Sequence, residues 1–338
     1  MTEVPHGTGP TAGPLVDPHG RTVRDLRISV TDRCNFRCTY CMPEEGMDWL
    51  SRDDLLSFEE IDRVARVCVE RFGFTGIRLT GGEPTVRNHI TVLIEKLAAL
   101  GTDLAMTTNG ATLAGLAPDL RAAGLRRLNI SCDSLRRDRF RELTKRDRLP
   151  QVLAGIDAAL AAGFDPVKVN VVPIRGVNDD ELVDFADFGR EKGVIVRFIE
   201  MMPLDAQHEW SRDRMVPAAE IVEAIGRVHP LVPVEERGNQ PAERFRFADG
   251  TGEIGVVASV TRSFCSTCDR VRLTAEGMFR NCLFALRETD LRAVLRGGGT
   301  DDDLAAAIAD EVGQKWAGHT IGQVSFVQPA RAMSQIGG

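Results

Sequence analysis

The stretch that decides the fold is residues 25–41, "DLRISVTDRCNFRCTYC", in which a strand-like run passes directly into three closely spaced cysteines. Residues 25–30 alternate polar and apolar side chains, the period of a β-strand with one buried face. Cys34, Cys38 and Cys41 follow within eight positions. Clustered cysteines of this kind typically bind metal. The stretch therefore predicts a strand that ends in a metal-binding loop.

A second group of three cysteines lies far down the chain, at Cys265, Cys268 and Cys282. A structural zinc site needs four closed ligands, whereas a four-iron cluster held by three thiolates keeps one iron open to a small molecule. Each group supplies three thiolates, which favours clusters. Zinc remains the alternative, with His319 as a fourth ligand for the second group.

The bulk composition narrows the class of protein. The chain has 338 residues, of which 43% are hydrophobic and 27% charged, as in ordinary globular proteins. The net charge of −7 argues against general nucleic-acid binding, which needs a basic surface. The sequence has no apolar run of about 20 residues and no signal-peptide layout, so we expect no membrane partner and a cytoplasmic location.

Strand-like and helical stretches alternate from residue 24 to about 200. Six consecutive β–α units predict a parallel sheet, either doubly wound or an open barrel, whose carboxyl edge holds the ligands. Ser57 and Glu60 form a capping box at the first helix. The expected strands are 25–30, 76–84, 103–110, 125–134, 166–174 and 194–203, and the helices are 57–73, 89–100, 112–123, segments up to 162, and 178–193.

The ends of the chain differ from this middle part. Residues 1–20 are rich in Gly, Pro and Thr, and we expect a disordered leader. Residues 21–230 form the β/α part. Residues 231–338 combine short antiparallel strands with an alanine-rich helix at 301–316, which predicts a small α+β unit. The remaining cysteines, Cys68 and Cys132, lie in a helix and a strand, where we expect plain core packing.

The C-x3-C-x2-C loop after the first strand, together with "TGGEP" at 80–84, resembles the radical S-adenosylmethionine (SAM) superfamily. This resemblance implies an incomplete, TIM-like β/α barrel of about six β–α units. It also implies a [4Fe-4S] cluster on Cys34, Cys38 and Cys41 that cleaves SAM to a 5′-deoxyadenosyl radical. The cofactor carries such chemistry because side chains alone cannot.

Both cysteine groups together are similar to the GTP 3′,8-cyclase family of molybdenum-cofactor biosynthesis. The similarity runs from about residue 25 to the C-terminus, through "IRLTGGEPTVR", "TTNG", "SCDSL", "VKVN", "RFIEMMP", "FCSTCDRVRLT" and the final "IGG". It implies a lyase in which the radical removes the 3′ hydrogen of GTP and the ribose carbon attacks guanine C8. The product is (8S)-3′,8-cyclo-7,8-dihydroguanosine 5′-triphosphate.

The family resemblance also implies partners and further cofactors. A second [4Fe-4S] cluster on the C-terminal cysteine group anchors the guanine base of GTP. An electron donor reduces the protein, and a cyclic pyranopterin monophosphate synthase uses the product. The oligomeric state, including a homodimer, is left open by the sequence.

Site residues carry over position by position from the family. Arg27 and Arg78 also stand at inward positions of their strands, where a charge is rare without a ligand. The C-terminal Gly337 and Gly338 are expected to reach into the active site. The resemblance assigns SAM contacts to Tyr40, Gly82, Ser131 and Met202, and GTP contacts to Arg27, Arg78, Thr107, Lys168, Arg270, Val271 and Arg272.

Two other readings compete with this hypothesis. A radical SAM enzyme that modifies peptides can also carry an auxiliary cluster, although such enzymes often use more cysteines than are found here. A non-enzymatic iron–sulfur carrier or zinc-bearing module would need fewer of the polar strand ends seen in this chain. Fold alone does not separate these functions, because barrels host many chemistries.

Overall fold

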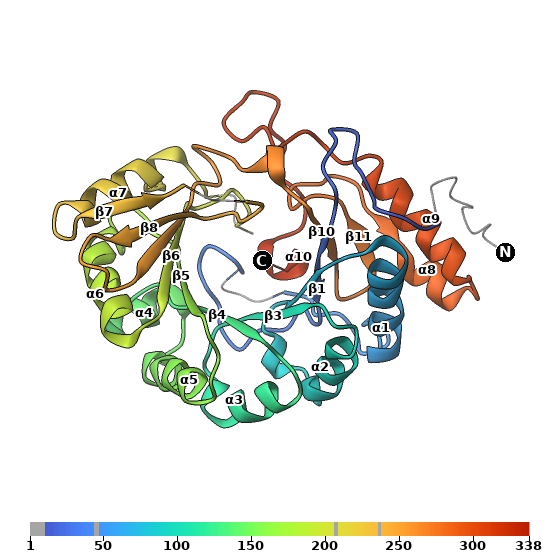
Figure 1. The fold of residues 1–338 in the computed structure, drawn as a ribbon, viewed down its shortest axis with the longest axis horizontal. Helices are drawn as coiled ribbons and strands as arrows, with labels where there is room; N and C mark the ends of the chain where they lie inside the picture. The colour runs from blue at the N-terminus through green and yellow to red at the C-terminus, as the bar shows by residue number, and fades with distance from the viewer. Residues whose placement is uncertain (1–10, 44–46, 206–208, 236–237, 338) are drawn as a thin grey trace.

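The computed structural model describes residues 11–43, 47–205, 209–235 and 238–337, and the strands of these residues form one curved sheet. Figure 1 shows the strands curving into an incomplete ring with helices on its outer side. This is the partial TIM-like barrel that the sequence predicts. The twelve strands of the described residues lie in the order β12-β11-β10-β1-β2-β3-β4-β5-β6-β9-β8-β7.

Six strands in the middle of the sheet are parallel and lie in sequence order, as predicted. The six strands are β1 (Asp25–Ser29), β2 (Gly76–Thr80), β3 (Asp103–Thr108), β4 (Arg127–Ser131), β5 (Val167–Val171) and β6 (Ile195–Ile199).

The capping box predicted at the first helix is confirmed. Ser57 Oγ accepts from the Glu60 N–H at 3.1 Å, and Glu60 Oε2 accepts from the Ser57 N–H at 2.7 Å.

The helices that cross between these strands cover the outer side of the sheet. The first of them, α1 (Phe58–Arg66), continues as a π-helical turn over Val67–Arg71. The others are α2 (Ile90–Ala98), α3 (Leu113–Ala122), α4 (Arg137–Thr144), α5 (Leu149–Ala161), α6 (Leu182–Lys192) and α7 (Ala218–Gly226). Short 3-10 turns lie at Pro84–Val86, Asp179–Glu181, Arg212–Arg214 and Cys265–Thr267.

The C-terminal strands form antiparallel hairpins, as expected, but they also extend the barrel at both edges. β9 (Glu253–Val257) pairs in parallel with β6, and β10 (Arg270–Leu273) pairs in parallel with β1. The outer strands β7 (Leu231–Val234) and β8 (Glu243–Phe247), and β11 (Met278–Arg280) and β12 (Thr289–Asp290), are antiparallel. Because β10 pairs with β1, the second cysteine group lies beside the strand that leads into the first cysteine group.

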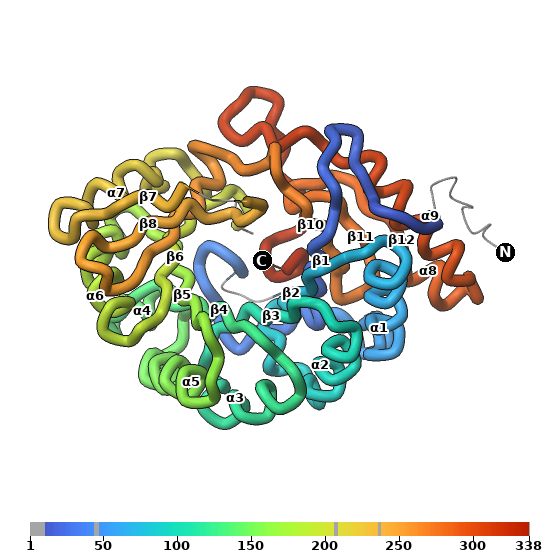
Figure 2. The backbone as a smooth tube through the Cα atoms, in the orientation of Figure 1, coloured from blue at the N-terminus to red at the C-terminus, as the bar shows by residue number. Residues whose placement is uncertain are grey.

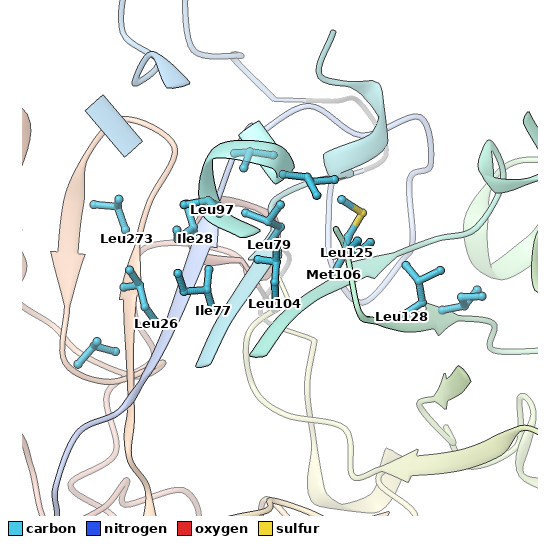
Figure 3. Packing of buried hydrophobic residues seen from close by; sticks show 14 of the residues in the cluster. Leu26, Ile28, Ile77, Leu79, Leu97, Leu104, Met106, Leu125, Leu128 and Leu273 are labelled. Carbon is cyan, nitrogen blue, oxygen red and sulfur yellow. The ribbon is translucent and has the colours of Figure 1, made fainter. Parts of the chain in front are cut away.

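Apolar side chains on the outer face of the strands form the core. Figure 3 shows Leu26 and Ile28 of β1 packed near Ile77 and Leu79 of β2. Each of these four side chains is at most 1% exposed. Cys68 and Cys132 belong to the same core, at 0% and 1% exposed, which confirms their predicted packing role.

The segment before β1 is packed against the rest of the molecule. Leu15 is 3% exposed in the main core, and Asp17 forms a buried ion pair with Arg21 at 2.5 Å. This corrects the predicted disorder for residues 11–20, because one buried leucine and one buried ion pair hold them in place. Residues 1–10 of the predicted leader lie outside the described residues.

Three further helices follow the barrel: α8 (Leu291–Arg296), α9 (Asp301–Val312) and the short α10 (Met333–Ile336). Figure 1 labels α10 inside the ring of strands, and Figure 2 shows the same segment, in red, near β1. The last turn of the chain therefore lies where the strands converge. None of the helices built from described residues has the length and apolar character to cross a bilayer.

Candidate active site

Three guanidinium groups lie side by side on the inner face of neighbouring strands. The register places Arg27 of β1 opposite Arg78 of β2 on one side and opposite Arg272 of β10 on the other. Because successive side chains of a strand point to opposite faces, all three turn away from the helix-covered core. We call these three residues the arginine row.

The arginine row is largely withdrawn from solvent, with Arg272 buried and Arg27 and Arg78 half-buried, and its one paired anion is Asp25, whose Oδ1 lies 3.8 Å from Arg27 Nε among the described residues. Burial, followed by repulsion from neighbouring arginines, lowers the pKa of Arg27 to about 9 and that of Arg272 to about 9. Burial likewise lowers the pKa of Arg78 to about 10. The Nε atoms of all three, and of Arg270, have no acceptor among the described residues. Buried cations of one sign are costly unless an anion joins them, so the row fits a polyanionic ligand.

Lys168 and Thr107 extend the polar lining across the middle strands. Asn129 of β4 lies in register with Thr107 on one side and Lys168 on the other. Its Nδ2 donates to Thr107 Oγ1 at 3.5 Å. Burial and the nearby charge of Arg197 lower the pKa of Lys168 to about 8. The two predicted residues therefore face the same interior as the arginine row.

Arg197 of β6 joins this lining and was missed by the sequence reasoning. Its Nε and Nη2 donate to Asn170 Oδ1 at 3.0 and 2.7 Å, and Nη2 also donates to Asn129 Oδ1 at 3.0 Å. Burial and repulsion from Arg27 lower its pKa to about 10. Alternation along β6 could have revealed it, because Arg197 stands between the buried Val196 and Phe198.

Arg270 and Val271 begin β10. The Arg270 guanidinium carbon lies 4.4 Å from the ring centre of Phe264, and its Nη2 donates to Cys268 Sγ at 3.3 Å. Val271 is fully buried and lies in register with Leu26, so its side chain belongs to the outer core. Only the backbone of Val271 can serve a ligand on the inner side.

The first cysteine group follows the carboxyl end of β1. Cys34 Sγ accepts from the Phe36 N–H at 3.3 Å, and the Cys41 N–H donates to the Cys38 carbonyl at 2.9 Å. Burial and the nearby Glu83 raise the pKa of Cys34 to about 11. Burial raises the pKa of Cys41 to about 12 and that of Cys38 well above its usual value. The three sulfur atoms lie within electrostatic reach of one another, which fits a shared cluster.

Tyr40 is fixed by a carboxylate from β4's carboxyl end. Its hydroxyl donates to Asp133 Oδ2 at 2.5 Å, and Asp133 Oδ1 accepts from the Val172 N–H at 2.9 Å. Burial raises the pKa of Asp133 to about 6. Ser131 is half-buried at the end of the same strand. Met202 is also half-buried and packs beside a small cluster that includes Ile336 of α10. Asp133 was not predicted as a site residue.

The "TGGEP" turn packs against the chain that leads into the first cysteine group. The Gly82 N–H donates to the Thr31 carbonyl at 2.7 Å. A side chain at Gly82 would collide with the carbonyls of Asp32 and Arg33. The Glu83 carboxylate is saturated, since it accepts hydrogen bonds from Thr85, Thr108 and Asn109. Gly82 therefore lies close to protein backbone. The contacts of Gly82 and Glu83 together join the loops that follow β1, β2 and β3 at the carboxyl edge of the sheet.

The second cysteine group lies among cations. Burial raises the pKa of Cys268, but the charges of Arg270 and Lys315 outweigh it and lower the value to about 7. Burial also opposes ionisation of Cys265, yet hydrogen bonds from His319 leave its pKa below normal. Cys282 is half-buried beyond β11. Such an environment suits three thiolates that share an anionic cluster.

Among the described residues, no three His, Cys, Asp or Glu side chains are placed around a single metal ion. The assignment of the first trio to a cluster therefore rests on the donor chemistry and on the electrostatic reach between its thiols. That of the second trio rests on the donor chemistry and on the cations that Cys268 and Cys282 share.

The end of the chain closes against β1 and β2. Gly337 has φ of +82°, and a side chain there would collide with Thr80 and crowd Ser29, the last residues of these strands. Position 337 therefore requires glycine. Upstream, the Arg331 guanidinium bonds the Glu288 carboxylate at 2.6 Å and also pairs with Glu276. Gly338 lies outside the described residues.

Comparison with known proteins gives two family matches along the chain. Residues 28–189 match the Radical SAM superfamily, whose cofactors are a four-iron cluster and SAM, and residues 194–321 match Molybdenum Cofactor Synthesis C. Among solved structures, Streptococcus suis SuiB bound to S-adenosylmethionine is similar with a TM-score of 0.60. That match covers 81% of this chain and 64% of SuiB at 12% identity, so it shows the fold alone.

Curated relatives match along nearly the whole chain. The GTP 3′,8-cyclase of Mycolicibacterium smegmatis is 48% identical over 338 residues, covering 97% of this chain and 93% of the relative. That of Streptomyces coelicolor is 49% identical over 328 residues, covering 96% of both chains. With this identity over this length, the chain belongs to the GTP 3′,8-cyclase family of radical SAM enzymes.

Proposed function

We propose that this protein converts GTP to (8S)-3′,8-cyclo-7,8-dihydroguanosine 5′-triphosphate, the first step of molybdenum-cofactor biosynthesis. The observation that carries the proposal is the arginine row. It lies on β1, β2 and β10, between a cysteine trio that follows β1 and another whose Cys268 precedes β10. A triphosphate supplies the negative charge that the row lacks.

The first trio and its surroundings form the SAM side of the proposed site. Cys34, Cys38 and Cys41 would hold a four-iron cluster, and Tyr40, held by Asp133, would line the bound SAM. Ser131, Gly82 and Met202 are the other proposed SAM contacts. When bound, the cluster and SAM supply the radical that removes the 3′ hydrogen of GTP.

The GTP side uses the charged lining of the barrel. The arginine row, Arg270 and Lys168 would bind the phosphates, while Thr107 and the Val271 backbone would complete the contacts. We add Arg197 to this set, because it is buried among the same cations and is oriented by two asparagines. These fixed guanidinium forks would orient the ribose without moving, since their positions are set by the sheet.

The second trio would hold the guanine base through a second four-iron cluster on Cys265, Cys268 and Cys282. Gly337 and Gly338 would approach the substrate from the carboxyl edge. The position of Gly337 against Thr80 and Ser29 supports this role, since no larger residue fits there.

Several accompanying features belong to the same proposal. We expect a cytoplasmic enzyme that takes electrons from a reducing donor and passes its product to a cyclic pyranopterin monophosphate synthase. A homodimer is compatible with the proposal. The division of the chain at residue 230 stays a prediction, because one sheet spans both parts.

The proposal is tested on anaerobically purified protein. Iron and sulfide analysis should find about eight irons per chain, as two four-iron clusters require. Incubation with SAM, a reductant and GTP should then consume GTP and release 5′-deoxyadenosine. SAM cleavage that is equally fast with and without GTP would contradict the substrate assignment. It would favour the peptide-modifying alternative, which a screen with peptides could follow.

A further inference from the structure

Lys315 is a buried lysine that no part of the proposed reaction uses. It follows α9, is 3% exposed, and its ammonium donates to the Arg270 carbonyl at 2.7 Å and to the Asn281 carbonyl. Arg270 stands two positions after Cys268, and Asn281 immediately precedes Cys282. One ammonium group therefore joins the two chain segments that present Cys268 and Cys282.

Within the described part of the chain, no carboxylate pairs with the Lys315 ammonium. Both of its acceptors are neutral carbonyls, and the groups that favour its charged form are the thiols of Cys268 and Cys282. An isolated buried ammonium is expensive, and its cost is recovered only if an anion lies nearby. Thiolates ligating an iron–sulfur cluster would supply that negative charge.

A second buried cation, Arg21, holds the backbone of Cys265, the remaining cysteine of the trio. Arg21 Nη1 donates to the Cys265 carbonyl at 2.5 Å and to the Ala317 carbonyl at 2.9 Å, while Nη2 donates to the Trp316 carbonyl at 2.5 Å. Asp17 pairs with Arg21, so this cation is compensated within the protein. Arg21 thus serves geometry, whereas Lys315 adds its charge to that of Arg270 beside the trio.

We propose that Lys315 is a counter-ion of the second cysteine trio: its ammonium joins the segments of Cys268 and Cys282 and raises the reduction potential of the cluster they hold. A nearby positive charge stabilises the more negative, reduced form of a cluster. Lys315 is a positioning residue, since it reaches the substrate only through the cluster. This inference rests on the proposed function, which places a cluster on the second trio.

The test uses the full-length, anaerobically reconstituted protein with two substitutions at this position. Lys315→Gln keeps hydrogen-bond donors but removes the charge, whereas Lys315→Met removes both. Lys192→Met, at an exposed lysine that pairs with Asp157, is the matched control. Iron per chain and a potentiometric titration followed by electron paramagnetic resonance report on the clusters. SAM cleavage without GTP reports on the first cluster alone.

Lys315→Gln should keep about eight irons per chain while the potential of the second cluster shifts to a more negative value. Lys315→Met should show the same shift and lose about half or more of the second-cluster iron, because outer-sphere partners typically change metal affinity 10–100-fold. The control should match the wild type. If Lys315→Met does not fold, Lys315→Gln still decides the matter.

An unchanged potential in Lys315→Gln would overturn the counter-ion role, even if Lys315→Met lost iron. Wild-type protein with about four irons would overturn the proposed second cluster, and this inference would fall with it. Eight irons with unaltered potentials would overturn this inference alone.

Discussion

The two cysteine trios offer the same three thiols in opposite electrostatic surroundings. Around the first trio, burial and the carboxylates of Glu83 and Asp133 raise the pKa values of the thiols. Around the second, Arg270, Lys315 and His319 lower the pKa values of Cys268 and Cys265. The number of ligands therefore does not distinguish the two sites, but the charges around them do.

The difference matches two different tasks. A cluster that must give an electron to SAM is better placed among negative charges, which make its reduced form less stable and more reducing. A site that must bind an anionic nucleotide is better placed among cations. We therefore expect the proposed second cluster to be reduced at a less negative potential than the first.

The largest expected effects on activity come from replacing one cysteine in each trio. Cys41→Ala should abolish SAM cleavage, with a loss of at least about 100-fold, because a direct ligand matters more than its outer-sphere partners. Cys282→Ala should lose GTP turnover to a similar extent but still release 5′-deoxyadenosine slowly. Chromatography of the products with and without GTP measures both. Loss of both clusters in Cys282→Ala would show that the trios are not independent.

The cationic side of the comparison is tested at the arginine row. Arg272→Met should weaken GTP binding about 10–100-fold, since a charge-assisted hydrogen bond contributes about 1.5–3 kcal/mol. Isothermal titration with GTP on iron-replete protein measures the change. Arg137→Met, at an exposed arginine paired with Asp147, should leave the Kd unchanged. An effect on SAM cleavage without GTP would argue that Arg272 acts on the first site instead.

Thiol reactivity in cluster-free protein compares the two trios directly. With pKa values of about 7 for Cys268 and about 11 for Cys34, pH 8 leaves Cys268 mostly thiolate and Cys34 mostly thiol. A low-pKa thiolate is the weaker nucleophile, so the expected advantage of Cys268 is about tenfold. Mass spectrometry of iodoacetamide-treated protein gives both rates over pH 6–9. Equal rates at pH 8 would remove the electrostatic distinction.

The smallest expected effect is on the pH dependence of GTP binding, through Lys168 in the charged lining of the barrel. Its pKa is lowered to about 8, so its charge is present below that pH and is lost as the pH rises above it. GTP binding should therefore weaken a few-fold between pH 7 and 9, because a bound phosphate raises the pKa of Lys168 and the complex keeps a proton that the free protein loses over this range. Lys168→Met should flatten this pH dependence of the Kd. A slope that persists in the variant would assign it to another group.

Much of the barrel was predictable because its signals are local. The six parallel strands, the helices between them and the Ser57 capping box follow from alternation and end signals within short windows. The parallel pairing of β9 and β10 with the barrel edges was not predicted. Such pairings join residues up to about 245 positions apart, and no short-range pattern encodes them.

The site residues also divide into those that a local sequence pattern reveals and those that only the fold reveals. Arg27 and Arg78 could be found from alternation on their strands, whereas Arg197 carried the same signal and was overlooked. Asp133 could not be chosen from the sequence, because its importance comes from its hydrogen bond to Tyr40. Lys315 gave no signal at all, since a lysine at the end of a helix is ordinarily exposed.

The sequence by itself determined the two cysteine trios, the order of the barrel strands and the presence of inward arginines. Each of these is written in residue spacing, which the chain carries before it folds. Only the tertiary structure decided that Arg272 stands beside Arg27, that residues 11–20 pack through Leu15 and Asp17, and that Lys315 is buried against the second trio. The physical reason is that register and burial are set by contacts between distant segments. These contacts turn two similar cysteine patterns into electrostatically different sites.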